Sequence, residues 1–169
     1  MRSINPATGE TIREYPQPGP DEVARRLELA ARMFAAWRRT TYSARAVLMR
    51  RAATKLREGR ERFARLMTGE MGKPIAAAEA EVDKCALTCD HFAEHAGRFL
   101  APEPVASDAV RSEISYEPLG VILAVMPWNF PFWQAFRAAV PALMAGNVMI
   151  LKHASNVPGC ALAIEEVFA

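Results

Sequence analysis

The sequence has few of the features that mark membrane, secreted or disordered proteins. Its 169 residues include only three cysteines, an odd number that argues against a disulfide framework. No uninterrupted apolar run approaches the ~20 residues that span a bilayer, and the first residues lack the apolar core of a signal peptide. Hydrophobic residues make up 51% and charged residues 24%, which is typical of a globular domain with a packed core. These features predict a soluble, cytoplasmic protein without a membrane partner.

The sequence also has little excess charge, because its formal net charge is only +2. The charge is uneven, since residues 21–70 hold 13 of the 21 Lys and Arg but only 6 of the 19 Asp and Glu. One interpretation is a basic helical binder of nucleic acid, because arginine clusters on helices neutralise phosphates. We favour a solvated helical face and expect no nucleic-acid partner, because no aromatic stacking pattern or recognition-helix motif accompanies the charge.

Apolar residues recur at helical spacing through the first hundred residues. The spacing predicts three helices, over residues 21–37, 44–69 and 74–101. The second is expected to begin after Ser43, which is a good N-cap. Residues 1–109 are therefore predicted to form a helical N-terminal part.

The pattern changes after this helical part. Residues 110–118 alternate between apolar and polar side chains, which predicts an edge strand. Residues 121–125 and 148–151 are continuous apolar runs, which fit parallel strands buried on both faces. A helix expected over about residues 132–145 joins them, so residues 119–169 predict a βαβα unit of an α/β fold. Two strands cannot cover both faces of such a sheet, and we expect the chain to be the N-terminal part of a larger protein.

Ligands of open α/β sheets bind beyond the carboxyl ends of the parallel strands. The segments 126–131 and 152–155 follow the two apolar runs. If the strands are neighbours, Asn129 and Lys152 open onto one crevice. An amide there can donate to a developing oxyanion, and a lysine can donate to ribose hydroxyls or a phosphate. An asparagine in this place can equally be a turn residue that caps the next helix, and the residues alone leave both interpretations open.

A series of motifs resembles the aldehyde dehydrogenase superfamily across nearly the whole chain. In chain order these are Asn-Pro-Ala-Thr-Gly-Glu from residue 5, Glu-Pro-Leu-Gly-Val from 117, Pro-Trp-Asn-Phe-Pro from 127, Pro-Ala-Leu from 141, Ala-Gly-Asn from 145 and Leu-Lys from 151. The segment 152–158 is most similar to the NAD(P)-dependent succinate-semialdehyde dehydrogenase branch. The resemblance implies the N-terminal portion of the aldehyde dehydrogenase fold, with helices and an edge strand around the start of a Rossmann-like parallel sheet.

The resemblance also implies an activity. Such an enzyme oxidises an aldehyde, in this branch succinate semialdehyde, to its carboxylic acid with NAD or NADP through a cysteine thiohemiacetal. Asn129 matches the residue that stabilises the oxyanion, and Arg137 matches an arginine that grips the substrate carboxylate, with Trp133 also at the substrate. Ser155 stands where NAD-selective relatives often carry a glutamate, so NADP should be tolerated. The implied cofactor-binding residues are Met126, Pro127, Trp128, Asn129, Lys152, His153, Ala154 and Ser155.

The family's nucleophilic cysteine, its glutamate base and its glycine-rich cofactor loop have no match in this sequence. We therefore expect the catalytic domain to be absent from this chain, which alone should be inactive. Cys85 and Cys89 lie on an apolar helical stripe and favour core packing. On one helix His91 points about 200° away from Cys89, and structural zinc normally takes a second ligand pair from another element, so we expect no metal site. Cys160 lies near a predicted helix start, where its pKa could be lowered.

The resemblance implies that the complete enzyme is a homodimer or homotetramer. The predicted strand 110–118 would lie near the contact between its subunits. Its small-molecule partner would be the aldehyde. Two alternatives remain at this point: an aldehyde dehydrogenase with a different substrate, and a truncated, non-catalytic module for folding or oligomerisation.

Overall fold

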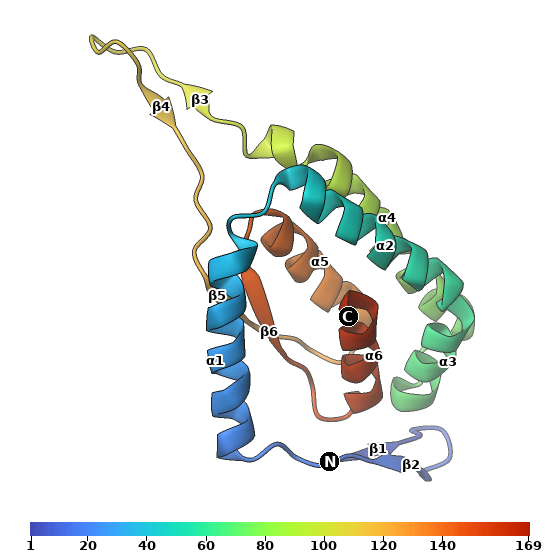
Figure 1. The fold of residues 1–169 in the computed structure, drawn as a ribbon. Helices are drawn as coiled ribbons and strands as arrows, with labels where there is room; N and C mark the ends of the chain where they lie inside the picture. The colour runs from blue at the N-terminus through green and yellow to red at the C-terminus, as the bar shows by residue number, and fades with distance from the viewer.

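A computed structural model describes all 169 residues, as helices gathered around a parallel pair of strands (Figure 1). The chain forms an α/β fold, as the sequence predicts. In chain order the elements are β1 (Arg2–Ile4), β2 (Thr11–Glu14), α1 (Pro20–Trp37), α2 (Tyr42–Glu58), α3 (Arg60–Met71), α4 (Ile75–Phe99), β3 (Glu103–Pro104), β4 (Glu113–Ile114), β5 (Val121–Val125), α5 (Pro131–Met144), β6 (Val148–Lys152) and α6 (Pro158–Phe168).

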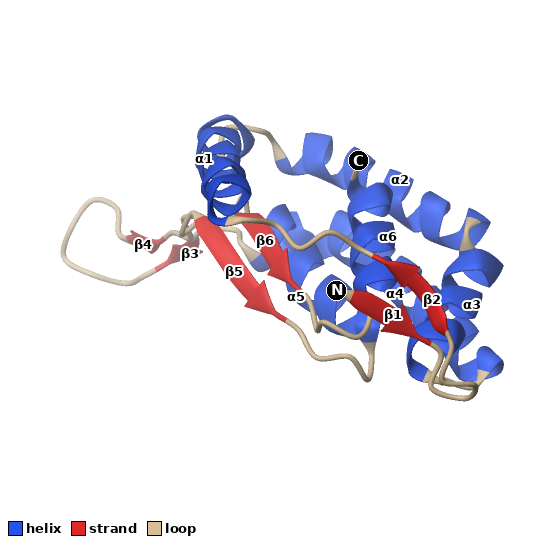
Figure 2. Ribbon diagram, turned by 90° about the horizontal axis from the view of Figure 1, so that it is seen from below, coloured by secondary structure: helices blue, strands red, loops and turns tan.

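Three two-stranded sheets accompany the helices. β1 and β2 form an antiparallel hairpin, β3 and β4 form a second, and β5 pairs with β6 in parallel. Figure 2 shows the arrows of β5 and β6 running in the same direction, with the β1–β2 hairpin set apart from them. Both α1 and α5 contact β5 and β6, and α5 also packs against α4. The parallel pair is therefore tied to the helical body through the helix that connects its strands.

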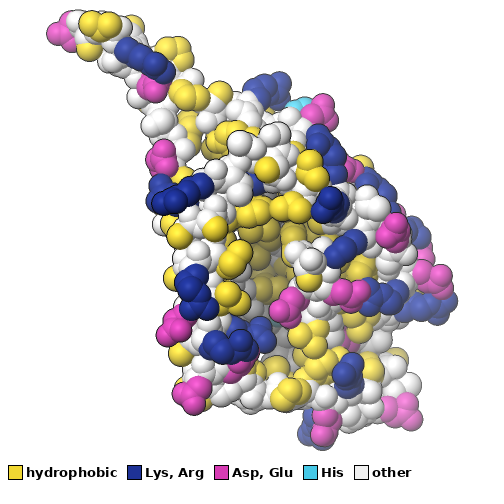
Figure 3. Space-filling model, viewed as in Figure 1, with side chains coloured by type: hydrophobic (Ala, Val, Ile, Leu, Met, Phe, Trp, Pro, Cys, Tyr) yellow, Lys and Arg dark blue, Asp and Glu magenta, His cyan; other side chains and the backbone are white.

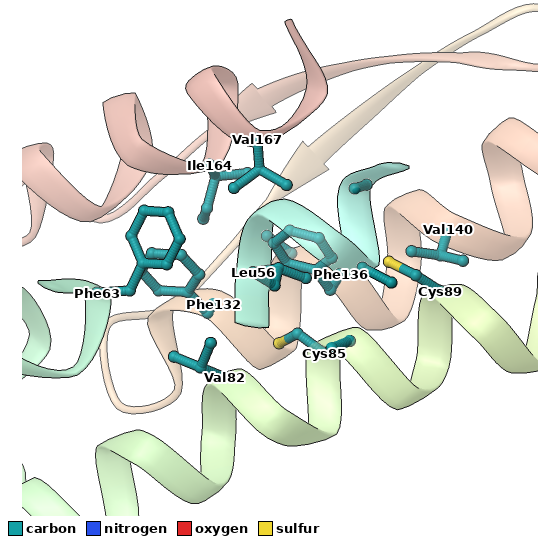
Figure 4. Close-up of a cluster of buried hydrophobic side chains, with 14 of the residues drawn as sticks. Leu56, Phe63, Val82, Cys85, Cys89, Phe132, Phe136, Val140, Ile164 and Val167 are labelled. Atoms are coloured by element: carbon teal, nitrogen blue, oxygen red, sulfur yellow. The ribbon is translucent and has the colours of Figure 1, made fainter. Parts of the chain in front are cut away.

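The hydrophobic core lies between helices rather than on a sheet. Side chains from α2, α3, α4, α5 and α6 converge in it (Figure 4). The rings of Phe63 and Phe132 lie 5.2 Å apart between centroids, and Phe132 stacks on Phe136 at 6.3 Å. Leu56 and Val82 fill the space around these rings and are fully buried. Full burial of each such side chain stabilises the fold by about 1.5–3 kcal/mol.

The helix predictions are confirmed with two corrections. The apolar stripe predicted for 74–101 forms α4 with nearly the same bounds. The single helix predicted over 44–69 is divided at Gly59 into α2 and α3, and Thr41 rather than Ser43 caps α2 by accepting from an amide of its first turn. A Cβ on Gly59 would lie 2.4 Å from the Phe63 ring, so close packing requires glycine at this division.

Neither predicted strand is buried on both faces within this chain, because β5 has one exposed face and β6 is only half-buried. The open face agrees with the expectation that two strands cannot cover such a sheet. Leu123 and Val125 are 66% and 64% exposed, whereas Ala124 is 5% exposed. The alternation arises because helices cover only one face of β5. Figure 3 shows a hollowed region beside α1 in which apolar side chains gather.

The edge strand predicted over 110–118 is shorter than expected. Only β4 forms there, and it pairs with β3 at the base of an arm that projects from the helical body (Figure 1). Tyr116 donates to Glu103 across the arm. The remaining alternating residues have no neighbouring strand, so a strand-like pattern alone does not produce a ladder.

Basic residues of the N-terminal helices often face carboxylates. Arg25 and Arg26 share Glu22 within α1, and Arg62 of α3 makes two hydrogen bonds with Glu166 of α6. This pairing favours the interpretation of residues 21–70 as a solvated helical surface. The longest helix, α4, carries too many charged residues to cross a membrane, and no other helix combines the required length and hydropathy.

Candidate active site

The carboxyl ends of β5 and β6 meet at one edge of the parallel pair. Val125 is in register with Lys152, and the next amide, that of Met126, donates to the carbonyl oxygen of Lys152 over 3.1 Å. The segments 126–131 and 152–155 therefore leave the sheet from the same edge, as the sequence predicts for neighbouring parallel strands.

The segment after β5 presents polar and aromatic side chains to solvent. Trp128 is 50% exposed and Phe130 is 44% exposed, and Asn129 between them is exposed as well. The helix α5 begins directly behind them, with Phe130 as its N-cap residue and Pro131 in its first turn. Phe130 provides no side-chain cap, and Asn129 makes no side-chain hydrogen bond to the helix. The carboxamide of Asn129 is thus not used as a helix cap, which was the alternative that the sequence left open.

Buried polar side chains hold the backbone of this segment. The Lys73 ammonium group donates to the carbonyl oxygen of Asn129 over 3.1 Å. Glu81 Oε1 accepts from the amides of Phe132 and Trp133 at 2.9 and 2.8 Å, which satisfies two free N–H groups in the first turn of α5. Lys73 and Glu81 form an ion pair with each other. The loop is therefore fixed from behind while its side chains remain exposed.

His153 joins the two segments at the edge of the sheet. Its Nδ1 accepts from the amide of Ala154 at 2.8 Å, so the neutral ring carries its proton on Nε2, which donates to the carbonyl oxygen of Pro131 over 2.9 Å. Burial lowers the pKa of His153, which favours the neutral ring. Both ring nitrogens have partners inside the chain, so the imidazole holds the site together from within.

Lys152, the last residue of β6, and Ser155, three residues later, differ from these buried groups. Both are exposed. None of the ion pairs in the molecule involves Lys152, so its ammonium group is free to meet an anionic or hydroxyl ligand. This edge therefore offers one unpaired cation and one neutral hydroxyl.

Trp133 and Arg137 lie together at a hollow of about 350 Å³ between α4 and α5. Arg137 is exposed and has no carboxylate partner, and the ammonium group of Lys84 lies 3.9 Å from the centre of the Trp133 ring. The hollow has cationic and apolar groups and no carboxylate, which suits a small anion with an apolar stem. Its lining residues are Lys84, Leu87, Thr88, His91, Phe92, Trp133 and Arg137.

The cysteines are not reactive groups. Cys85, Cys89 and Cys160 are fully buried. Burial raises the pKa of Cys89 to about 12 and raises that of Cys85 and Cys160 as well. The prediction of a lowered pKa for Cys160 is wrong, because loss of solvation outweighs the helix start and the Glu70 carboxylate beside it adds to the effect. The core role predicted for Cys85 and Cys89 is confirmed.

Sequence reasoning missed Lys73 and Glu81. A signal existed for Glu81, because it lies between Ala78 and Cys85 on the stripe of α4 that is otherwise apolar. A charged residue in such a stripe indicates a buried partner. Lys73 has no comparable signal, because it lies in the short connection between α3 and α4.

Known proteins resemble this chain in sequence. A family model described as the aldehyde dehydrogenase family matches residues 1–169. A probable NADP(+)-dependent succinate-semialdehyde dehydrogenase of Synechocystis sp. (strain ATCC 27184 / PCC 6803 / Kazusa) is 55% identical over 99% of this chain and 37% of its own length. The NAD(P)+-dependent succinate semialdehyde dehydrogenase of Escherichia coli (strain K12) is 49% identical over 98% of this chain and 36% of its own length.

Solved structures show the same likeness. The succinic semialdehyde dehydrogenase of Streptococcus pyogenes, determined in complex with NADP+, superimposes with a TM-score of 0.95 at 36% identity, over 99% of this chain and 37% of that one. The present chain thus spans a little over a third of the length of the relatives it matches. The match of the family model over residues 1–169 shows that this chain belongs to the aldehyde dehydrogenase family.

Proposed function

We propose that this chain forms the N-terminal portion of an enzyme that oxidises succinate semialdehyde to its carboxylic acid with NADP or NAD. Residues 1–109 form the helical part of the cofactor domain, 110–118 belong to an oligomerisation arm, and 119–169 form the first βαβα of the nucleotide-binding sheet. The nucleophilic cysteine and the glutamate base are supplied by residues outside this chain. The complete enzyme assembles as a homodimer or homotetramer.

Asn129 stabilises the oxyanion in this proposal. Attack of a thiolate on the aldehyde carbonyl places negative charge on its oxygen, and a side-chain amide that already points at that place lowers the barrier. Two observations support the role. The carboxamide is exposed and free of intrachain partners, and the backbone that carries it is fixed by Lys73.

The sheet edge fits a dinucleotide. The exposed, unpaired ammonium group of Lys152 can donate to ribose hydroxyls or phosphate, and the Trp128 indole and the backbone at 126–127 and 153–154 border the same edge. Ser155 brings no negative charge, so a 2′-phosphate meets no repulsion there. When bound, the nicotinamide supplies the hydride acceptor.

The hollow between α4 and α5 receives the substrate carboxylate. Arg137 can form paired hydrogen bonds with a carboxylate, and Trp133 offers an apolar wall for the short methylene chain. The observation that carries the choice of substrate is this unpaired arginine on the same helix that begins directly after Asn129. The names of the relatives from Synechocystis and Escherichia coli point to the same substrate.

A test uses a complete dehydrogenase in which residues 1–169 replace the matching part of the Synechocystis relative, called here the completed dehydrogenase. Arg137→Met should raise KM for succinate semialdehyde about 10-fold or more, because a charge-assisted pair is lost, and leave KM for a neutral aldehyde unchanged. Arg32→Met, which removes an exposed arginine of α1, is the matched control. Equal effects of Arg137→Met on both aldehydes would remove the assignment of succinate semialdehyde.

A further inference from the structure

The loop that carries Asn129 rests on a buried pair of opposite charges. Lys73 is 8% exposed and Glu81 is 4% exposed, and the two side chains form an ion pair. Glu81 comes from α4 and Lys73 from the connection before it, so neither belongs to the sheet or to α5. The hydrogen bonds of the two side chains go to each other and to the backbone of residues 129–133, and none goes to Lys152 or Ser155. The hydrogen bonds of the pair therefore reach the site through the backbone of the loop.

Each member of the pair holds a different part of that loop. Glu81 accepts from the amides of Phe132 and Trp133, so it fixes the first turn of α5 and places its negative charge at the helix N-terminus. Lys73 donates to the carbonyl oxygen of Asn129, and its ammonium group lies 3.7 Å from the centre of the Phe130 ring. Contacts on both sides of Phe130 leave the peptide that carries the Asn129 side chain little freedom to rotate.

We infer that Lys73 and Glu81 are positioning residues that fix the direction of the Asn129 carboxamide, an inference that rests on the proposed role of Asn129. An oxyanion donor contributes only if it is aimed before the charge develops. A displacement of about 1 Å at such a group can lower a rate about 100-fold. The pair supplies that constraint from behind the loop, where it cannot obstruct substrate or cofactor.

Stability alone does not explain a charged pair in this place. Replacing a buried ion pair by apolar side chains of similar size is often neutral or stabilising, because two charges must be desolvated. Here each charge also makes directional hydrogen bonds to the loop backbone, which an apolar pair cannot make. The directional contacts point to positioning.

The test combines Lys73→Met with Asn129→Ala in the completed dehydrogenase. Lys73→Met should lower kcat about 10-fold to 100-fold, because the Asn129 carboxamide is misplaced. KM for the aldehyde should change little. The fall should be equal for succinate semialdehyde and for a neutral aldehyde, since both form the same oxyanion. In the Asn129→Ala background, Lys73→Met should cause no further fall, because the group that it positions is gone.

Two variants separate positioning from general loss of stability. Lys73→Arg keeps the charge and should recover most of kcat. Arg45→Met is the control, because it removes another buried cation. The Arg45 guanidinium group donates to the carbonyl oxygen of Met144, at the opposite end of α5. Arg45→Met should lower the melting temperature about as much as Lys73→Met and leave kcat unchanged.

If Lys73→Met does not fold, Glu81→Gln takes its place in the same cycle. The amide keeps an oxygen for Phe132 and Trp133 but loses the charge that pairs with Lys73, so hydrogen exchange at those two amides should become faster as kcat falls. The positioning inference would be overturned if the Lys73 or Glu81 variant left kcat unchanged. It would also be overturned if the variant lowered kcat by the same factor with and without Asn129→Ala. Either result would leave the proposed function intact. An undiminished kcat in Asn129→Ala alone would instead overturn the proposed role of Asn129.

Discussion

The imidazole of His153 donates from Nε2 to the carbonyl oxygen of Pro131 over 2.9 Å. This bond connects the segment that follows β6 with the first turn of α5, so the two walls of the candidate site are joined through one side chain. Burial lowers the pKa of His153 below its ordinary value of 6.5. The folded state therefore disfavours protonation of Nδ1, which would break the hydrogen bond that this nitrogen accepts from the amide of Ala154.

The pKa of His153 predicts a pH dependence of stability. The unfolded chain binds a proton on this ring at a higher pH than the folded chain does, so protonation favours unfolding as the pH falls below 6.5. The contribution of His153 is complete above that pH and is lost toward the lower pKa of the folded state. His153→Gln, whose amide can donate to Pro131 without titrating, should flatten this part of the profile. Urea unfolding from about pH 5 to about pH 7 measures the effect, and equal slopes in the two proteins would contradict it.

Glu70 is predicted to stabilise the start of α6. Its two carboxylate oxygens each accept from a backbone amide, those of Gly159 and Cys160, at 2.9 Å. Glu70→Ala leaves both amides buried without acceptors and should lower the free energy of unfolding by about 3 kcal/mol. Glu28→Ala removes an exposed carboxylate of α1 and should change it by less than about 0.5 kcal/mol. Equal effects of the two substitutions in urea titrations would show that the contacts of Glu70 contribute nothing.

Ser155 is predicted to permit the use of NADP. Ser155→Glu places a carboxylate at the exposed end of the segment after β6, where it repels a 2′-phosphate and can accept from ribose hydroxyls. KM for NADP should rise about 10-fold, because the repulsion of one close pair of like charges weakens binding by about that factor. KM for NAD should stay the same or fall. Steady-state rates with both cofactors in the completed dehydrogenase provide the measurement. A parallel change in both constants would mean that residue 155 does not meet the 2′ position.

Local periodicity predicted those parts of the fold that depend on one helix face or one strand. The bounds of α4 followed from uninterrupted spacing between Ile75 and Phe99, and β5 and β6 followed from short apolar runs. The division at Gly59 was not predictable, because it depends on the close approach of the Phe63 ring. An open face of the two-stranded sheet was expected, but strand composition did not reveal that Leu123 and Val125 lie on it.

The candidate site was predictable only in its exposed half. Asn129 and Lys152 follow the carboxyl ends of neighbouring strands, and that rule depends on topology alone. The buried half depends on pairing between residues far apart in the chain. Lys73 meets a carbonyl oxygen 56 residues away, and no local pattern encodes such a contact.

The rate of aldehyde oxidation by the completed dehydrogenase carrying Asn129→Ala tests the account most directly. With saturating aldehyde and NADP, loss of the amide donor should lower kcat by about 10²–10³ while the protein stays folded. The same rate with and without the carboxamide would contradict the assignment of this sheet edge as the place where the oxyanion forms.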